Sequence, residues 1–206
     1  MDLVGTLRTT GAVREFVDEP IPDDVVHRVL DTARFAPSGG NRQAWHVVVV
    51  RDPAVRRHVR DLYTAGWYEY LAQGQAGLTP FAAIADDAAE AKAMEGAGAV
   101  ADAAAAGPGG FAEHLDRYTL VGGASVYPFA WSILLAARAE GLGGVITTMP
   151  IAREPALKAL LAVPDEFAVA AVIALGKPVR QVRRLRRAAV EQFATVDRFT
   201  GDAFRA

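Results

Sequence analysis

The sequence predicts an α+β fold, because segments with helical periodicity alternate with short apolar runs rich in β-branched residues. The clearest strand signals are residues 46–50 and 167–175, and the clearest helix signal is the apolar stretch that begins at Ser125. A chain of 206 residues is long enough to bury a sizeable core in one domain. We therefore expect a single domain over 1–206.

The first third of the chain contains three helical segments and one strand. Residues 2–9 are predicted to form a short helix, and residues 22–35 a second one that begins at Pro22 and Asp23. His46 to Val50 is a continuous apolar run, as in a buried strand. Residues 53–65 are predicted to form a helix whose apolar face carries Val55, Val59 and Leu62.

The last third repeats the alternation. A long helix is expected to begin at Ser125 and to end at Gly141, and it is apolar nearly all round, which favours burial, also against another subunit. A strand over 145–148, a helix over 154–161 and a strong strand over 167–175 are expected to follow.

The region between these thirds differs in composition. Residues 66–117 are rich in Ala, Gly and Asp, and we interpret them as helical excursions and loops that form a mobile lid. Three aromatic residues lie near the start of this predicted lid segment: Trp67, Tyr68 and Tyr70. The tail, residues 180–206, is basic and then amphipathic, and we expect this C-terminal extension to wrap a neighbour or to close the site.

Composition excludes several classes of function. The chain has no cysteine, which rules out disulfides, thiolate catalysis and Cys-ligated metals. Its net charge of -2 argues against a nucleic-acid partner. No segment is long and apolar enough to span a membrane, and no signal peptide is recognisable at the N-terminus, so we expect a cytoplasmic protein.

The segment Ala36 to Trp45, with the sequence APSGGNRQAW, is the strongest candidate ligand loop. Pro37 ends the preceding helix, and Gly39 and Gly40 let the main chain approach a ligand closely. Ser38, Asn41 and Gln43 supply polar atoms that can bond to carbonyls and ring nitrogens. Ordinary connecting loops have a similar composition, so this segment alone does not decide between a ligand loop and a plain connector.

Together with its surroundings, this loop resembles the nitroreductase family. The other matching segments are the basic opening element RTTGAVREF (8–16), the acidic entry DEPIP (18–22), the segment GLGGVITT (141–148) and the arginine-rich tail after LGKP (175–178). The resemblance covers both ends of the chain and most of its middle, apart from residues 65–117. It implies a nitroreductase-like fold, with a mainly antiparallel central sheet flanked by helices, in an intertwined homodimer.

The resemblance further implies FMN as cofactor and NADH or NADPH as electron donor. The implied FMN contacts fall in the opening element, in the loop, in the glycine segment and in the tail. They are Thr10, Gly11, Ala12, Arg14, Pro37, Ser38, Gly39, Asn41, Gln43, Gly143, Gly144, Val145, Arg186 and Arg187. The family's basic residue at the place of Arg14 lies near the pyrimidine edge of the flavin, where positive charge stabilises the reduced ring. The 37–41 loop is implied to reach the flavin of the partner subunit.

The chain departs from the family pattern at three places. Thr10 and Gly11 replace the usual basic pair, and Ala12 replaces serine, which shifts phosphate binding toward Arg186, Arg187 and Arg8. Ala44 stands where proline is usual. Only residues 118–121 are available for the strand that the family places before the long helix, so that strand is missing or much reduced.

No side-chain catalytic group is predicted. His27, His58 and His114 are interpreted as surface residues and His46 as a core or rim residue, because none has metal-ligand spacing to another ligand. Ser125 lacks the surroundings of a nucleophile and is interpreted as a helix N-cap.

The predicted activity is hydride transfer from NAD(P)H through flavin N5 to an oxidised acceptor such as a nitroaromatic, a quinone or an activated alkene, in a ping-pong cycle. Trp67, Tyr68, Tyr70, Tyr127 and Phe129 are candidates to stack on that acceptor, and plain packing explains them equally well. Two alternatives remain: a flavin-dependent dehydrogenase or oxidase of a small metabolite, and a flavin-binding dimer that has lost turnover.

Overall fold

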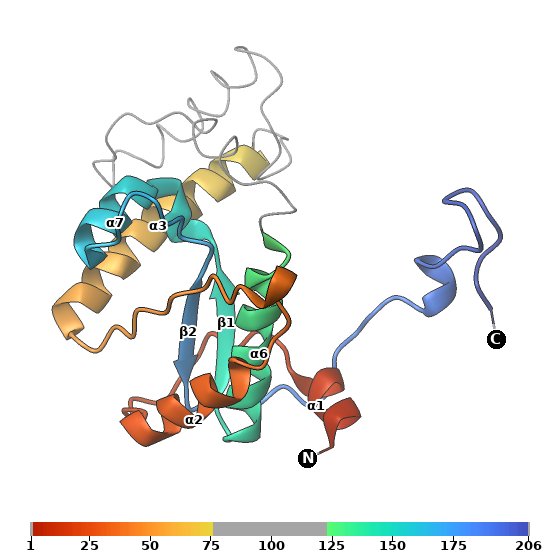
Figure 1. Cartoon of the computed structure of the whole chain (residues 1–206), viewed down its shortest axis with the longest axis horizontal. Coiled ribbons are helices and arrows are strands. Elements are labelled where there is room, and N and C mark those ends of the chain that lie inside the picture. Colours follow the sequence, from red (N-terminus) through yellow and green to blue (C-terminus); the bar gives the residue numbers. More distant parts are fainter. Residues whose placement is uncertain (1, 76–122, 206) are drawn as a thin grey trace, which may run out of the picture.

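The computed structural model describes residues 2–75 and 123–205 (Figure 1). Its elements, in chain order, are α1 (Leu3–Thr9), α2 (Asp23–Ala33), the 3-10 turn η1 (Gly39–Asn41), α3 (Pro53–Gln75), α6 (Val126–Ala139), β1 (Gly143–Thr147), the 3-10 turn η3 (Met149–Arg153), α7 (Glu154–Leu161), β2 (Val172–Gly176) and the 3-10 turn η4 (Val190–Gln192).

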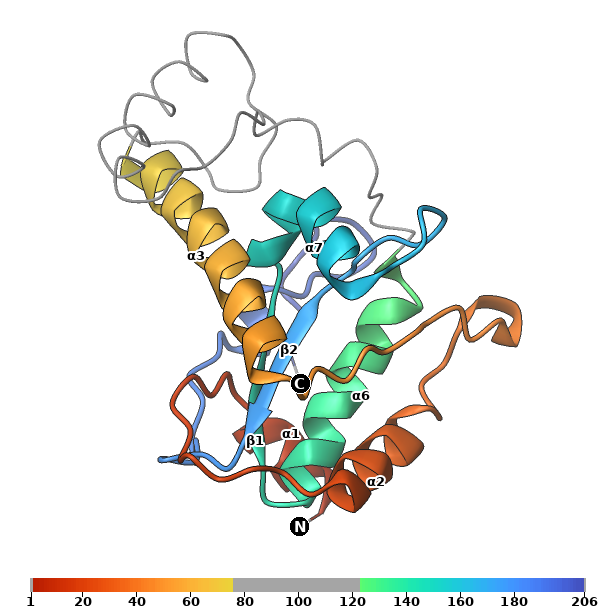
Figure 2. The ribbon, with the colours of Figure 1, turned by 90° about the vertical axis from the view of Figure 1, so that its left-hand side faces the viewer.

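The sheet of the described residues consists of β1 and β2, which pair antiparallel from Gly143 opposite Gly176 to Thr147 opposite Val172. Helix α6 packs against β1, and α2 packs against α6, so both helices cover one side of the sheet (Figures 1 and 2). Helix α3 and helix α6 lie on opposite sides of the strands in Figure 2, and α3 contacts η3 and α7. The predicted α+β class is confirmed.

The main core lies where α2 meets α6. Val29 and Ala33, four residues apart on α2, are fully buried against Phe129 and Ile133 of α6. The ring of Trp45 stacks on that of Phe129 with centroids 4.5 Å apart. Trp45 thereby fixes the end of the candidate ligand loop to the core. The other buried members of this core are Ala136, Ala137 and Leu142.

The helix ends follow the signals in the sequence. Helix α2 begins directly after Pro22, and its first turn carries Asp23 and Asp24, which the helix dipole favours there. Hydrogen bonds to Glu140 and Asp24 raise the pKa of the Arg28 guanidinium and join α2 to the end of α6. Helix α6 ends before Gly141, whose φ of 79° is the left-handed conformation that glycine adopts without strain.

Helix α3 is longer than the predicted segment 53–65 and continues to Gln75. Residues 66–75, which we interpreted as the first part of the lid, therefore belong to α3. Gly66 does not break this helix but lies where α3 touches the backbone of Met149 in η3, so that the missing side chain allows close contact. The rest of the predicted lid, 76–117, and the candidate strand 118–121 lie outside the described residues.

The predicted buried strand 46–50 is wrong. These residues have no regular secondary structure, and Val47, Val48 and Val49 are 38–47% exposed. The apolar run was interpreted as buried on both faces, but within residues 2–75 and 123–205 no strand pairs with it. A second correction concerns 167–175, of which only Val172 onward pairs with β1. Both corrections have one cause, since a ladder forms only where a neighbouring strand is available.

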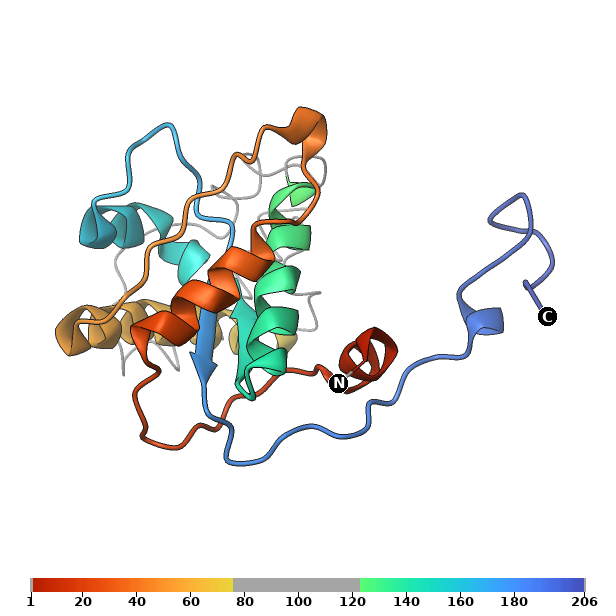
Figure 3. The ribbon, with the colours of Figure 1, turned by 60° about the horizontal axis from the view of Figure 1, so that its bottom comes forward.

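The C-terminal segment 188–205 lies away from the rest of the structure (Figures 1 and 3). Its bridge between Thr195 and Ala203 and its turn η4 are local contacts. Large apolar side chains along it are exposed, and Phe199 is 95% exposed. They are Val190, Phe193, Val196, Phe199 and Phe204. None of the helices within residues 2–75 and 123–205 combines the length and apolar character that crossing a membrane requires.

Candidate functional site

The structure brings the opening element and the glycine segment together. Ala12 forms a parallel bridge with Gly144, and the backbone N–H of Val13 donates to the carbonyl of Gly144 at 2.9 Å. Thr10 is buried beside this contact, and its hydroxyl donates to the carbonyl of Thr6 at 2.8 Å. Residues 10–14 thus form an added edge to β1, with the exposed Arg14 directly beyond the bridge.

Packing already requires the two glycines of β1. A side chain at Gly143 would meet Val13 Cγ2 at 2.8 Å, and one at Gly144 would meet the carbonyl oxygen of Ala174 at 2.8 Å. Both residues are buried, and Val145 beside them is half-buried. Their predicted backbone contacts with a flavin stay a prediction, because close packing explains the glycines on its own.

The C-terminal tail passes the same place. A side chain at Gly11 would meet Leu185 Cδ2 at 2.8 Å and Val182 Cγ1 at 3.4 Å, so the tail lies directly on the opening element. Arg186 and Arg187 follow this contact and are exposed. Among the described residues, neither forms an ion pair with a carboxylate, and the same holds for Arg14. This corner of the molecule therefore offers uncompensated positive charge beside the start of β1.

The candidate ligand loop has an unusual backbone. Gly40, Asn41 and Gln43 have φ values of 58°, 53° and 48°, in the left-handed region that non-glycine residues rarely adopt. The loop is held by the N–H of Gln43, which donates to Ser38 Oγ at 3.0 Å, and by Gln43 Nε2, which donates to Asn41 Oδ1 at 3.1 Å. Such strain at exposed, hydrogen-bonded positions is typical of binding loops. Pro37 and Gly39 of this loop are exposed as well.

Ser125 connects the loop to α6. It occupies the N-cap position, as predicted, but its side chain makes no capping bond to the helix. Its Oγ instead accepts a hydrogen bond from the backbone N–H of Gly39 at 3.1 Å. The predicted capping role is therefore wrong, since the hydroxyl anchors the loop across 86 residues of sequence.

Replacing Ser125 with alanine is expected to loosen this anchor. The lost hydrogen bond is worth about 0.5–1.5 kcal/mol, and amide exchange at Gly39 should become faster. Ser132→Ala is the matched control, because Ser132 Oγ donates only within its own helix, to Pro128. Equal exchange at Gly39 in both variants, measured by hydrogen–deuterium exchange, would show that Ser125 does not hold the loop.

The structure does not bring all the predicted flavin residues together in one chain. Ser38, Gly39 and Asn41 lie at the start of α6, whereas residues 10–14 and 143–145 lie beside its C-terminal half, where a side chain at Gly144 would meet Leu134 Cδ2 at 2.8 Å. Leu134 is eight residues after Val126, the first residue of α6, which separates the two groups by about 12 Å along the helix. One chain thus carries two half-sites, which we call the loop half-site (37–43) and the strand half-site (10–14, 143–145 and 186–187).

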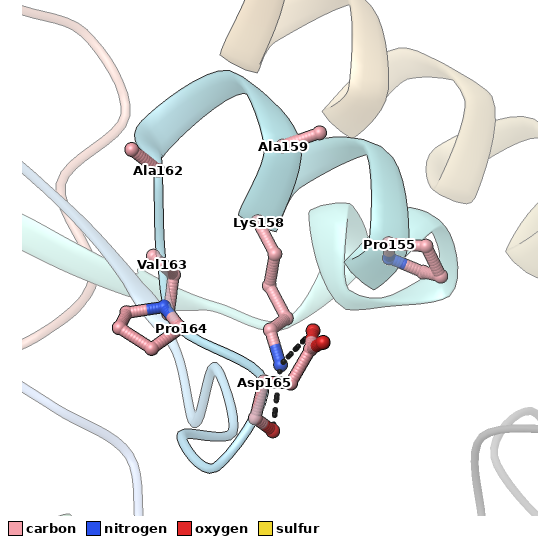
Figure 4. A pocket seen from close by; sticks show the side chains of 7 residues that line it. All are labelled: Pro155, Lys158, Ala159, Ala162, Val163, Pro164 and Asp165. Carbon is pink, nitrogen blue, oxygen red and sulfur yellow. Dashed lines mark hydrogen bonds and ion pairs between the residues drawn. The ribbon is translucent and has the colours of Figure 1, made fainter.

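Two cavities of the described structure lie elsewhere. The larger, of about 480 Å³, is formed at the end of α7 (Figure 4). Its lining residues are Pro155, Lys158, Ala159, Ala162, Val163, Pro164 and Asp165. The smaller, of about 280 Å³, lies between α2 and the segment 45–47 and is lined by His27, Leu30, Asp31, Arg34, Trp45, Val47 and Phe129. Neither contains a predicted flavin residue.

Sequence reasoning missed the polar interior of α7. Glu154 is fully buried, and its Oε1 accepts from the N–H of Val169 at 2.9 Å. Lys158 is buried as well, and its Nζ donates to the carbonyl of Asp165 at 3.0 Å (Figure 4). The same Nζ donates to the carbonyl of Phe167 at 2.8 Å. The i, i+4 spacing of the two charges was the available signal. These contacts hold the connection to β2, so the ammonium has a structural role.

Two other buried polar atoms lie near the strand half-site. Within the part of the chain that the structure describes, Arg138 Nε and Gln181 Oε1 have no hydrogen-bond partner. Arg138 Nη2 lies 3.5 Å from Thr9 Oγ1, and Gln181 precedes the tail residues that pack on Gly11. Nothing in the sequence pattern marked either residue.

The aromatic candidates separate into two groups. Phe129 is buried and stacked on Trp45, so packing explains it. The rings of Tyr63, Trp67 and Tyr70 form a stack along α3, with centroids 6.4 Å and 5.3 Å apart. Tyr127 is 47% exposed near the loop. Trp67, Tyr70 and Tyr127 therefore remain candidates for acceptor binding, and Tyr68 is half-buried beside them.

The histidines do not form a metal site in the described residues. His27 and His58 are exposed, as predicted, and His46, which was interpreted as a core or rim residue, is exposed as well. His114 lies outside the described residues. No group of three or more His, Asp or Glu side chains that could hold a metal ion occurs within 2–75 and 123–205.

Comparisons with known proteins found relatives that match most of the chain. An Archaeoglobus fulgidus protein, named as a candidate NADH dehydrogenase or NAD(P)H nitroreductase, is 29% identical over 172 residues, which is 82% of each chain. A Thermus thermophilus NADH dehydrogenase is 28% identical over 181 residues, 82% of this chain and 83% of that one. A shorter stretch of 48 residues, 23% of this chain and 22% of the other, is 44% identical to an iodotyrosine deiodinase of Haliscomenobacter hydrossis.

Solved structures show the same fold. The NADPH:FMN oxidoreductase of Vibrio harveyi, complexed with NAD⁺, matches with a TM-score of 0.64 and 20% identity, over 95% of this chain and 77% of that one. An iodotyrosine deiodinase bound to FMN and 3-iodo-L-tyrosine also matches with a TM-score of 0.64 and 20% identity, over 96% and 100%. The family model described as "Nitroreductase family" matches residues 7–177. The chain therefore belongs to the nitroreductase family.

Proposed function

We propose that this protein is an FMN-dependent oxidoreductase that takes a hydride from NADH or NADPH and delivers it to an oxidised organic acceptor, in a ping-pong cycle. Family membership supports the cofactor and the donor. The residues present fit FMN: exposed arginines without carboxylate partners in the described structure suit a phosphate dianion, and the loop offers amides on a left-handed backbone. When bound, FMN carries the two electrons between donor and acceptor.

The two half-sites of one chain lie apart along α6, and this separation is the main support for the proposal. The opening element is bridged to β1 beside the C-terminal half of α6, and the loop is tied to Ser125 at the start of that helix. We infer that the complete site forms between two copies of a single-domain chain, so that the strand half-site of one meets the loop half-site of the other. The exposed Trp131 and Tyr127 on α6, and the apolar residues of the tail, are surfaces that a second copy would cover.

In this assembly each group of residues has a separate task. Arg186 and Arg187 hold the phosphate of FMN, and Arg14 places positive charge near the ring, which stabilises its anionic reduced form. Asn41 and Gln43 present amide groups to the ring edge. No side-chain acid is assigned, so water or the cofactor supplies the proton.

Flavin binding is the first experiment. Purified protein is mixed with FMN, desalted, and treated anaerobically with NADPH and then with NADH. Retained flavin absorbance that bleaches with either nucleotide supports the proposal. Retained flavin that bleaches only with a small metabolite would support the dehydrogenase alternative, and retained flavin that no reductant bleaches would support the flavin-binding dimer without turnover. A protein that retains no flavin would contradict the proposal.

Mixed dimers test the shared site. Arg14→Ala damages only the strand half-site, and the Asn41→Ala, Gln43→Ala double variant damages only the loop half-site. Each variant alone should be nearly inactive, whereas an equal, randomly assorted mixture should regain about a quarter of the wild-type activity, because half of the dimers carry one intact site. A mixture that stays inactive, while size-exclusion chromatography shows mixed dimers, would place each site within one chain.

The nature of the acceptor has a second candidate. The local 44% identity to an iodotyrosine deiodinase favours a halogenated aromatic acceptor, from which two electrons and a proton would release halide and leave a C–H bond. Steady-state turnover with 3-iodotyrosine, a nitroaromatic and a quinone separates these classes. Iodide release from 3-iodotyrosine alone would favour the second candidate.

A further inference from the structure

The tail carries more positive charge than one flavin phosphate requires. Residues 180–187 contain five arginines and no carboxylate. All five are exposed, and among the described residues none forms an ion pair. Arg186 and Arg187 are assigned to FMN above, which leaves Arg180, Arg183 and Arg184 without a ligand. The whole chain has a net charge of -2, so this positive charge is local.

This basic strip (180–187) is fixed on the strand half-site. Val182 and Leu185 pack on Gly11, next to the bridge between Ala12 and Gly144. The backbone N–H of Val179 donates to the carbonyl of Glu15 at 3.1 Å, which fixes the start of the strip. Arginines held beside a site in this way lose less freedom on binding a ligand than those of an unanchored tail.

We propose that Arg183 and Arg184 bind the 2′-phosphate of NADPH and make the protein prefer NADPH to NADH. This inference rests on the proposed function. The strip is about 26 Å long if fully extended, which suits a ligand with several separated phosphates better than a single phosphate. NADPH and NADH differ only in the 2′-phosphate, and arginine pairs bind such a dianion bidentately.

The test measures binding without turnover. Adenosine 2′,5′-bisphosphate and 5′-AMP differ by the 2′-phosphate alone, and both are titrated into the FMN-loaded protein by calorimetry. The wild-type protein should bind the bisphosphate at least about tenfold more tightly. In the Arg183→Ala, Arg184→Ala variant this difference should disappear, and the ratio of kcat/KM for NADPH to that for NADH should fall about tenfold. FMN absorbance should be retained.

Arg56→Ala, Arg57→Ala is the matched control, because these residues form an exposed arginine pair on α3. This control variant should leave unchanged both the ratio of the affinities for the bisphosphate and 5′-AMP and the ratio of kcat/KM for NADPH and NADH. Equal binding of the two nucleotides to wild-type protein, or an unchanged ratio in the Arg183/Arg184 variant, would overturn the inference. So would dissociation of that variant into monomers, since the arginines would then serve a second copy. A protein that retains no flavin and oxidises neither nucleotide would instead contradict the proposed function.

Discussion

A Gly66→Ala variant is expected to lose about 1–3 kcal/mol of stability, although alanine is the better helix former. The added methyl group would overlap the backbone carbonyl of Met149, which cannot rotate away as a side chain could. Helix α3 and η3 would have to separate, and the partly buried ion pair of Glu69 with Arg153 spans the same interface. Urea unfolding, followed by circular dichroism, measures the loss.

Gly74 of the same helix gives the matched control. Among residues 2–75 and 123–205, a methyl group there meets nothing within 4 Å, so Gly74→Ala should stabilise the protein by about 0.5–1 kcal/mol through reduced backbone freedom. The two variants are therefore expected to change stability in opposite directions. If Gly66→Ala were as stable as Gly74→Ala, the close contact between α3 and η3 would be wrong.

A Lys158→Met variant is expected to lose about 2–4 kcal/mol of its free energy of unfolding. Methionine fills similar space, but it removes the hydrogen bonds to the carbonyls of Asp165 and Phe167, at 3.0 Å and 2.8 Å, and leaves these acceptors without their donor. The connection between α7 and β2 should then exchange its amide hydrogens faster. Thermal unfolding and hydrogen–deuterium exchange over 163–171 measure the two effects.

Lys177→Met is the control for this charge deletion. Lys177 pairs with Glu19 on the surface, where both side chains are 57% exposed. Because exposed ion pairs contribute little, the free energy of unfolding should fall by only about 0–1 kcal/mol. If Lys158→Met and Lys177→Met lost similar amounts of stability, the buried ammonium of Lys158 would contribute no more to stability than a surface ammonium does.

The sequence was sufficient where local signals decide the structure. Helix α7 has the predicted bounds, Glu154 to Leu161, and Gly141 ends the long helix as expected. Prediction failed where a distant neighbour decides. The run 46–50 has the composition of a strand but no pairing partner in the described residues. Gly66 lies inside α3 at the point where the backbone of η3 packs too closely for a side chain.

The candidate site follows the same division. Motifs identified the loop and the opening element, but no local pattern shows that Ser125 bonds to Gly39 rather than to its own helix. Nor does one show that the tail lies on Gly11. Those contacts depend on the packing of segments far apart in the sequence, which composition and periodicity do not encode.

Because α6 separates the two half-sites, the number of active sites should depend on the concentration of the chain. Because the two half-sites of one chain lie about 12 Å apart along this helix, we expect a second chain to complete each of them. Under the proposed assembly, the number of working sites follows mass action: in dilute solution it rises with the square of the chain concentration. Specific activity should therefore fall on dilution, and saturating FMN, by binding only the paired form, should counteract that fall.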